Sequence, residues 1–231
     1  SSSFDGGKRV QQLEKLLSKF VKSKFAVAVN SGTAALQASL YAIGIKPGDE
    51  VLVPSFTFVA TANSVKSVGA KPVFVDILKD NYTMDPSDLR RKITRKTKAI
   101  IPVHLYGHIA YMDEILEIAK KSSIKIIEDA SQSLGSKFKG KHSGTFSHLG
   151  CFSLYGGKVI TSGEGGVIVT DDKKLFEKLK QVRNHGLSKN NLTTTLGLNF
   201  RLSEINAAIA KIQMKKLPRL INERKKNAQI L

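Results

Sequence analysis

Short apolar runs alternate with helical patterns over most of this 231-residue chain, and this alternation restricts the fold more than any other feature. Short runs rich in valine and isoleucine predict buried strands, whereas apolar residues spaced three and four apart predict amphipathic helices. Strands that alternate with helices predict an α/β protein with a mostly parallel sheet. The expected strands cover residues 25–29, 51–53, 71–76, 99–103, 125–129, 151–154 and 167–170. The expected helices cover residues 8–20, 34–43, 58–68, 112–120, 172–184 and 202–217, and a further helix is expected to start within 84–89, with Pro86 near its first turn.

The expected strand at 25–29 is followed by Asn-Ser-Gly-Thr and then by an alanine-rich helical run. A turn of this kind forms a helix N-terminus whose free backbone N–H groups attract anions. The hydroxyls of Ser31 and Thr33 beside those amides would complete a receptor for a phosphate group. Simple capping of the helix by Ser31 or Thr33 explains the same residues, so the pattern leaves both interpretations open.

Lys158 lies in a polar, glycine-rich segment between the expected strands at 151–154 and 167–170. Gly156 and Gly157 allow the backbone to approach this lysine closely and to shelter it. Partial burial lowers the pKa of a lysine toward neutrality, and a neutral amine is a nucleophile that forms Schiff bases. A lysine on a surface hairpin is the alternative interpretation of this segment.

The expected strand at 125–129 ends in two acidic residues, Glu128 and Asp129. A carboxylate at the carboxyl end of a parallel strand points into the ligand crevice of an α/β sheet, so Asp129 is a candidate site residue. The alternative role for Asp129 is to cap the following turn. Phe56 and Phe58 lie at another junction of strand and helix, where a phenyl ring can stack on a planar ligand or pack in the core.

Other residues indicate whether the chain has a metal site or a disulfide, and which cellular compartment it suits. His104 and His108 have the spacing of two ligands on a helix, but Pro102 and Gly107 predict a loop, so we expect no metal site. The single cysteine, Cys151, excludes an internal disulfide and a cysteine-based zinc site, which fits a reducing compartment. No apolar run approaches membrane-spanning length, and we expect a soluble cytoplasmic protein without a membrane partner.

The chain is strongly basic, with 37 lysine and arginine residues, 19 aspartate and glutamate residues and a formal net charge of +18. Basic residues gather at 90–98 and at 211–226, mostly at polar positions of amphipathic helices. They lack interleaved aromatic residues and any nucleic-acid module signature, so we expect no nucleic-acid partner. A basic surface also draws in phosphorylated ligands by long-range attraction.

Eight motifs, in a common order over nearly the whole chain, resemble the DegT/DnrJ/StrS family of pyridoxal-phosphate-dependent sugar aminotransferases. They are Ser-Gly-Thr-Ala-Ala at 31–35, Pro-Ser-Phe-Thr at 54–57, Pro-Val-His-Leu-Tyr-Gly at 102–107, Glu-Asp-Ala-Ser-Gln at 128–132, Phe-Ser at 152–153 with Lys158, Gly-Glu-Gly-Gly at 163–166, Arg-Asn-His-Gly at 183–186 and Gly-Leu-Asn-Phe-Arg at 197–201. One such motif alone is weak evidence for the family, but eight motifs in the family's order are strong evidence. The resemblance implies the aspartate aminotransferase fold, fold type I, with a three-layer α/β/α large domain around a mostly parallel sheet.

The resemblance assigns catalytic roles to two residues and cofactor-binding roles to eight. Lys158 resembles the lysine that forms the Schiff base and then moves a proton, and Asp129 resembles the carboxylate that keeps the pyridinium nitrogen protonated. Both also count among the cofactor-binding residues, which further comprise Gly32, Thr33 and Ser153 at the phosphate, Gln132 at the phenolic oxygen, Phe58 on the ring face and Asn199 at the phosphate of a neighbouring subunit's cofactor. The resemblance therefore implies a homodimer with shared active sites.

The activity implied by the resemblance is transfer of an amino group from an amino acid, glutamate in the family pattern, to a nucleotide-linked keto-sugar. The product would serve amino-sugar or polysaccharide biosynthesis. A nucleotide-sugar dehydratase of the same family is one alternative, but that branch has a histidine where Lys158 stands. The other alternative is a non-catalytic, basic binding or regulatory homologue that keeps the fold.

We expect residues 1–217 to form the large domain that binds pyridoxal phosphate. Residues 218–231 would begin a helix that leads to a smaller C-terminal domain absent from this chain. Family members usually continue past this point, and the segment before Lys8 also looks shortened. The chain is therefore expected to be a fragment of a longer enzyme or a truncated homologue, and a truncated homologue could bind cofactor without sugar turnover.

Overall fold

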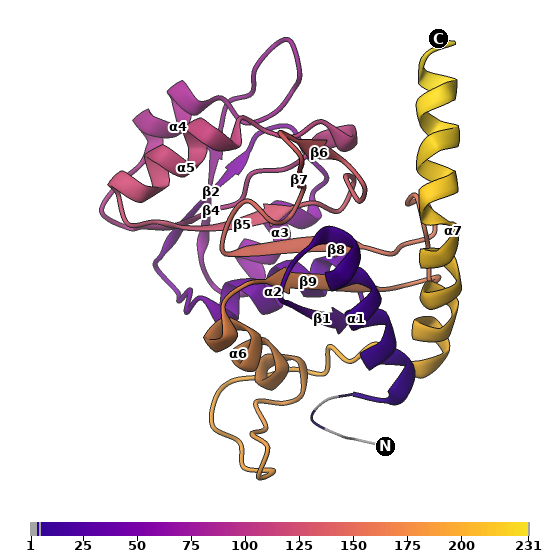
Figure 1. The fold of residues 1–231 in the computed structure, drawn as a ribbon. Coiled ribbons are helices and arrows are strands. Elements are labelled where there is room, and N and C mark those ends of the chain that lie inside the picture. The colour runs from indigo at the N-terminus through magenta and orange to yellow at the C-terminus, as the bar shows by residue number, and fades with distance from the viewer. Residues whose placement is uncertain (1–3, 5, 231) are drawn as a thin grey trace.

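The computed structural model describes residues 4 and 6–230 and shows a central sheet between helices (Figure 1). In these residues seven strands form the sheet, in the order β1-β9-β8-β5-β4-β2-β3. Neighbouring strands from β8 to β3 are parallel, whereas β9 is antiparallel to both β1 and β8. The predicted α/β fold with a mostly parallel sheet is confirmed. The strands are β1 (Phe25–Val29), β2 (Glu50–Pro54), β3 (Lys71–Val75), β4 (Thr97–Ile100), β5 (Lys125–Asp129), β8 (Leu149–Ser153) and β9 (Gly166–Thr170).

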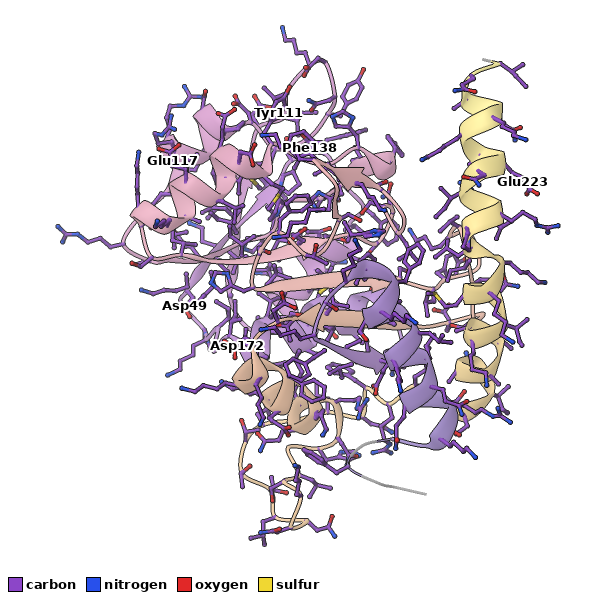
Figure 2. All side chains as sticks on the ribbon, in the orientation of Figure 1. Asp49, Tyr111, Glu117, Phe138, Asp172 and Glu223 are labelled. Carbon is purple, nitrogen blue, oxygen red and sulfur yellow. The ribbon has the colours of Figure 1, made fainter. Side chains whose placement is uncertain are left out.

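Apart from the C-terminal helix, the helices lie where the sequence predicts them. They are α1 (Lys8–Val21), α2 (Gly32–Ala42), α3 (Ala60–Ser67), α4 (Pro86–Lys92), α5 (Met112–Lys121), α6 (Lys173–Arg183) and α7 (Glu204–Ala228), with a 3₁₀ turn η1 (Leu105–Gly107). Polar side chains cap the starts of four of them: Ser31, Asp85, Asp172 and Ser203 accept hydrogen bonds from first-turn amides (Asp172 is labelled in Figure 2). Within the described residues, no helix is long and apolar enough to cross a membrane.

Alternation of side chains between the two faces of the sheet builds the three layers. On one face, Val27, Val53 and their neighbours pack against α2, α3 and α6. On the opposite face, Ala28 and Phe152 pack with α1 and α7, while Ile100 packs with α4 and α5. The expected three-layer α/β/α arrangement follows from these apolar clusters.

The C-terminal helix differs from the prediction. The sequence predicts a helix at 202–217 and a separate helical run from Pro218 to Leu231, but α7 continues through Pro218 as a single helix. Proline removes only one helical hydrogen bond, and buried Met214 and Leu217 hold the preceding turn against the core formed with α1. After Leu217 none of the described residues is buried, and this half of α7, which bears Glu223, stands at one side of the body of the molecule (Figures 1 and 2). Leu231 lies outside the described residues.

A small hairpin after β5 was not predicted. It consists of β6 (Lys137–Phe138) and β7 (Lys141–His142), whose two-residue strands are too short to produce an apolar periodicity. Its turn residues, Lys139 and Gly140, have φ angles of 49° and 78°, as a type I′ hairpin turn requires. The hairpin faces α7 across an open cavity described below.

Candidate active site

The carboxyl ends of β5 and β8 lie next to the N-terminus of α2. Asp129 at the end of β5 pairs in register with Cys151 of β8, two residues before Ser153. A Cβ atom added to Gly32 would lie 2.9 Å from the Cβ atom of Ser153, so the start of α2 approaches β8 as closely as a glycine allows. Three of the predicted site residues therefore share one edge of the sheet.

The first turn of α2 combines the two functions that the sequence left open. Ser31 caps the helix, because its hydroxyl oxygen accepts a hydrogen bond from the Ala34 N–H at 3.0 Å. The N–H groups of Gly32 and Thr33 have no partner among the described residues. With the Ser153 hydroxyl beside them, these amides form a cradle that suits a phosphate group at the positive end of the helix dipole.

Asp129 is 5% exposed, and both of its carboxylate oxygens are held in place. Oδ2 accepts a hydrogen bond from the Thr61 hydroxyl at 2.9 Å, and Oδ1 accepts one from the Ser131 N–H at 3.1 Å. The Thr61 hydroxyl also lies 3.2 Å from the Thr57 hydroxyl, one helical turn earlier. Each oxygen of Asp129 keeps accepting capacity for a cationic N–H group. Sequence reasoning missed Thr61, because its contact with Asp129 joins two segments that are far apart in the sequence.

The neighbouring acid, Glu128, is fully buried on the opposite face of β5. Its carboxylate accepts hydrogen bonds from the N–H groups of Gly144 and Ser147, both at 2.7 Å, and lies 2.9 Å from His104 Nε2. His104 Nδ1 accepts the Ala110 N–H at 3.3 Å, so the ring proton is on Nε2, which donates to Glu128. This network anchors the end of β5, and within the described residues no cluster of three or more His, Cys, Asp or Glu residues could hold a metal.

Lys158, Gln132 and Ser153 line one open cavity of about 1050 Å³. Lys158 is half-buried, and its Nζ atom has no hydrogen-bond or ion-pair partner in the described part of the chain. The amide oxygen of Gln132 accepts a hydrogen bond from the Tyr106 N–H at 3.0 Å. Because a backbone N–H can only donate, this bond fixes the amide orientation and leaves Gln132 Nε2 available as a donor.

Phe58 and Asn199 do not line this cavity. Phe58 is 69% exposed, which excludes the core-packing alternative, and it lies one turn before Thr61, the residue that holds Asp129. Asn199 lines a separate hollow, and its carbonyl oxygen accepts a hydrogen bond from Asn30 Nδ2 at 3.3 Å. The stacking role of Phe58 and the role of Asn199 toward a neighbouring subunit stay predictions.

The model of the DegT/DnrJ/EryC1/StrS aminotransferase family matches residues 1–231 of this chain. The chain belongs to this family. Its membership confirms the resemblance inferred from the eight motifs. The motifs at 102–107, 128–132 and 152–153 with Lys158 contribute residues that line the cavity of Lys158, whereas those at 183–186 and 197–201 line the separate hollow that contains Asn199.

Named relatives in this family act on nucleotide-linked sugars. GDP-perosamine synthase from Escherichia coli O157:H7 is 40% identical over 226 residues, which is 97% of this chain and 62% of that protein. UDP-2-acetamido-2-deoxy-3-oxo-D-glucuronate aminotransferase from Pseudomonas aeruginosa is 45% identical over 204 residues, 88% of this chain and 57% of that protein. The chain thus spans about three fifths of the length of these relatives.

Solved structures of DegT/DnrJ/EryC1/StrS relatives share the fold. The aminotransferase from Psychrobacter cryohalolentis has a TM-score of 0.93 and 35% identity, covering 96% of this chain and 60% of that one. The PLP form of Spr1654 from Streptococcus pneumoniae has a TM-score of 0.92 and 31% identity, covering 96% of this chain and 63% of that one. These likenesses confirm the expected fold type I of aminotransferases that use pyridoxal phosphate (PLP).

Proposed function

We propose that the protein containing this chain is a PLP-dependent aminotransferase. It moves an amino group from an amino acid, glutamate by the family pattern, to a nucleotide-linked keto-sugar for amino-sugar or polysaccharide biosynthesis. One observation carries the proposal: an unpartnered, half-buried Lys158 shares a cavity with Gln132, Ser153 and Ser131, the residue whose N–H donates to the carboxylate of Asp129. The names of the GDP- and UDP-sugar relatives support the substrate class.

The residues present fit PLP. The amides of Gly32 and Thr33 with the Ser153 hydroxyl offer donors to its phosphate. Gln132 Nε2 would donate to the phenolic oxygen, and the exposed Phe58 ring would stack on the pyridine face. The remaining two groups, Asp129 and Lys158, would meet the ring nitrogen and the aldehyde carbon.

When bound, the cofactor supplies an electron sink for the negative charge that forms at the α-carbon of the amino donor. Asp129 would keep the ring nitrogen protonated, because its carboxylate, fixed by Thr61 and Ser131, favours a positive charge beside it. Lys158 Nζ would take the proton from the donor's α-carbon and hold it for return on the cofactor side. The half-buried position of Lys158 limits competing contact of this amine with bulk water.

The test uses the full-length protein loaded with PLP. Glutamate should convert the cofactor to its amine form, seen as a loss of visible absorbance, and a nucleotide-linked keto-sugar should restore the aldehyde form. Lys158→Ala should abolish both half-reactions, whereas Lys66→Ala, which removes an exposed lysine on α3, should leave them unchanged. A loaded protein that gives no spectral change with any amino donor contradicts the proposal.

One relative supports a second candidate function. A pleiotropic regulatory protein from Geobacillus stearothermophilus is 41% identical over 229 residues, 99% of this chain and 62% of that protein. A regulatory homologue would keep the fold and could bind PLP without either half-reaction. The dehydratase alternative predicts loss of water from the sugar without amination, and the presence of Lys158 opposes it.

We also infer a homodimer with shared active sites. Asn199 is exposed and lies in a hollow apart from the Lys158 cavity, as expected of a residue that serves a neighbouring subunit. Mixing Lys158→Ala subunits with Asn199→Ala subunits should then restore one intact site in each mixed dimer. A monomer in light scattering, or no recovery of activity on mixing, contradicts the arrangement.

A cytoplasmic location is part of the proposal. Cys151 is a buried free thiol, and burial raises its pKa well above the usual range, so this cysteine stays an unreactive core residue. A chain without other cysteines suits a reducing compartment. Cell fractionation of the native protein tests the location, and recovery in a membrane or secreted fraction opposes it.

A further inference from the structure

The cavity that contains Lys158 extends to residues at the end of α1, in the β6–β7 hairpin and in α7. Figure 1 shows where these three elements lie. The charged residues that line it are Lys22, Lys137, Lys158, Arg224 and Lys225, all basic. Among the described residues, no aspartate or glutamate lines this cavity, and none of the five cations has an ion-pair partner. Positive charges that face one space without a counter-charge attract anions into it.

Helical spacing directs the α7 cations into the cavity. A Cβ atom added to Gly135 would collide with Ile221 Cδ1, so α7 meets the loop after β5 at this point. Arg224 and Lys225 follow Ile221 by three and four residues and therefore lie on the same helix face. Pro218, on the same face one turn earlier, also lines the cavity.

His142 lies in the hairpin, on the side of the cavity opposite α7, and its pKa responds to positive charges nearby. Its ring is 4% exposed and lies against Phe20, with ring centroids 5.1 Å apart. Nδ1 has no hydrogen-bond partner within the described residues. The pKa of His142 is lowered by burial and then by the positive charges of Lys137 and Lys22, so these two lysines act on the same ring from different elements.

We propose that Lys22, Lys137, Arg224 and Lys225, here called the basic arm of the cavity, bind the diphosphate group of a nucleotide-linked ligand. The inference rests on the proposed function, in which the amino acceptor is a nucleotide-linked sugar. Lysine and arginine side chains from three elements surround one space, which suits a group that carries several negative oxygens. Because the arm opens from the cavity of Lys158, a diphosphate held there leaves the attached sugar to extend toward the Lys158 amine.

The test is calorimetric titration of the full-length, PLP-loaded protein with GDP, UDP and inorganic pyrophosphate at low ionic strength. Two double variants remove the arm: Lys22→Gln with Lys137→Gln, and Arg224→Gln with Lys225→Gln. Each should weaken nucleoside diphosphate binding at least about tenfold, since charge-assisted bonds to phosphate are lost. Lys173→Gln with Lys174→Gln on α6 is the matched control, because it removes the same charge at exposed lysines away from the cavity.

A second measurement follows the His142 ring by NMR. A bound diphosphate should raise the pKa of His142, because it offsets the charges of Lys22 and Lys137 beside the ring. Unchanged affinity in both arm variants, equal losses in the control pair, or a His142 pKa unmoved by saturating pyrophosphate overturns the inference. The glutamate half-reaction, measured in the same samples, separates this failure from failure of the proposed function. It needs Lys158 and an amino donor but no nucleotide, so it persists if only the basic arm is misassigned and is absent if the protein is no aminotransferase.

Discussion

Two walls of the cavity that contains Lys158 are built in contrasting ways. On the sheet side, the end of β5 is held from several directions: Asp129 exchanges backbone hydrogen bonds with the carbonyl of Pro102 and the N–H of His104, at 2.9 and 3.0 Å. Beneath it, Glu128 is fully buried among donors. On the other side, α7 has no buried residue after Leu217 within the described chain, and this half of the helix meets the loop after β5 near Gly135.

We infer from this contrast that the sheet side of the cavity holds the reacting groups and that the α7 side admits ligands. Groups that must hold a reacting atom need a wall that opens only when the whole domain unfolds, and the buried network behind Asp129 provides one. A wall with few buried contacts opens locally at a lower free energy and suits ligand entry. We therefore expect substitutions behind β5 to affect global stability and chemistry, and substitutions at α7 to affect access and ligand affinity.

The largest effect is expected at Glu128. Glu128→Ala leaves the His104 Nε2–H and two backbone donors buried without an acceptor, and should lower the free energy of unfolding by about 3–5 kcal/mol. Urea unfolding measures it. Glu117→Ala, which removes an exposed ion pair with Lys121, is the control and should leave the midpoint unchanged. Equal unfolding midpoints for the two variants would contradict the proposed rigidity of the sheet wall.

Asp129→Asn should keep the fold and slow the amino-transfer half-reactions. The amide preserves shape and the Thr61 contact but no longer favours a protonated ring nitrogen, so the rate should fall about 10²-fold or more. Single-turnover kinetics with glutamate gives the rate, and circular dichroism checks the fold. Asp113→Asn, at an exposed ion pair with Lys139, is the matched control. A near-native rate in Asp129→Asn means that this carboxylate does not set the ring charge.

The sheet wall was more predictable from the sequence than the α7 wall. Local sequence patterns predict the main features of the sheet wall. The apolar run and its two acids predict the end of β5, and the Ser-Gly-Thr turn predicts both the Ser31 cap and the start of α2, where Gly32 lies close to β8. Pro218 misled the prediction, because the tertiary contacts of the preceding turn outweigh one missing hydrogen bond. Thr61 as a partner of Asp129 depends on residues that meet only after folding.

Other features had no local signal at all. The contact of Gly135 with Ile221 and the convergence of Lys22 and Lys137 on His142 join segments far apart in the sequence. The hydrogen bond between Glu128 and His104 could not be predicted for a similar reason. In the sequence, His104 and His108 are only two histidines in a loop, and nothing local indicates that His104 contacts Glu128. The basic arm could not be predicted either. The sequence does not show how α7 is oriented, and only that orientation places Arg224 and Lys225 in the same cavity as the other cations of the arm.

Gly135→Ala tests how firmly α7 is held. Gly135 has a φ of +101°, and an added Cβ would collide with Ile221, so the variant should lose about 1–3 kcal/mol of stability and bind nucleoside diphosphate less tightly. Gly44→Ala is the control, because Gly44 also has a positive φ, +83°, but nothing lies within 4 Å of its Cβ position. A ligand affinity that falls equally in both variants contradicts a specific role for the contact with α7.

The smallest effect is a change in pH dependence at His142. Its folded pKa lies below the ordinary 6.5, so the unfolded chain binds more protons in that window, and stability is lost as pH falls through 6.5. His142→Leu should flatten this part of the stability profile. His148, whose pKa burial also lowers, keeps a residual slope in both proteins, so the difference between the two profiles is the measurement. Identical profiles from pH 5 to 7, measured by urea unfolding, contradict the assignment.

The central claim is that Lys158 is the amine that carries the cofactor. The full-length protein, incubated with PLP, reduced with borohydride, digested and mapped by mass spectrometry, should carry the label on Lys158. Lys158→Ala should carry none, while Lys22→Ala, which changes another lysine of the same cavity, should still be labelled on Lys158. Label on a different lysine of the unmodified sequence, or no retained cofactor before reduction, contradicts the account.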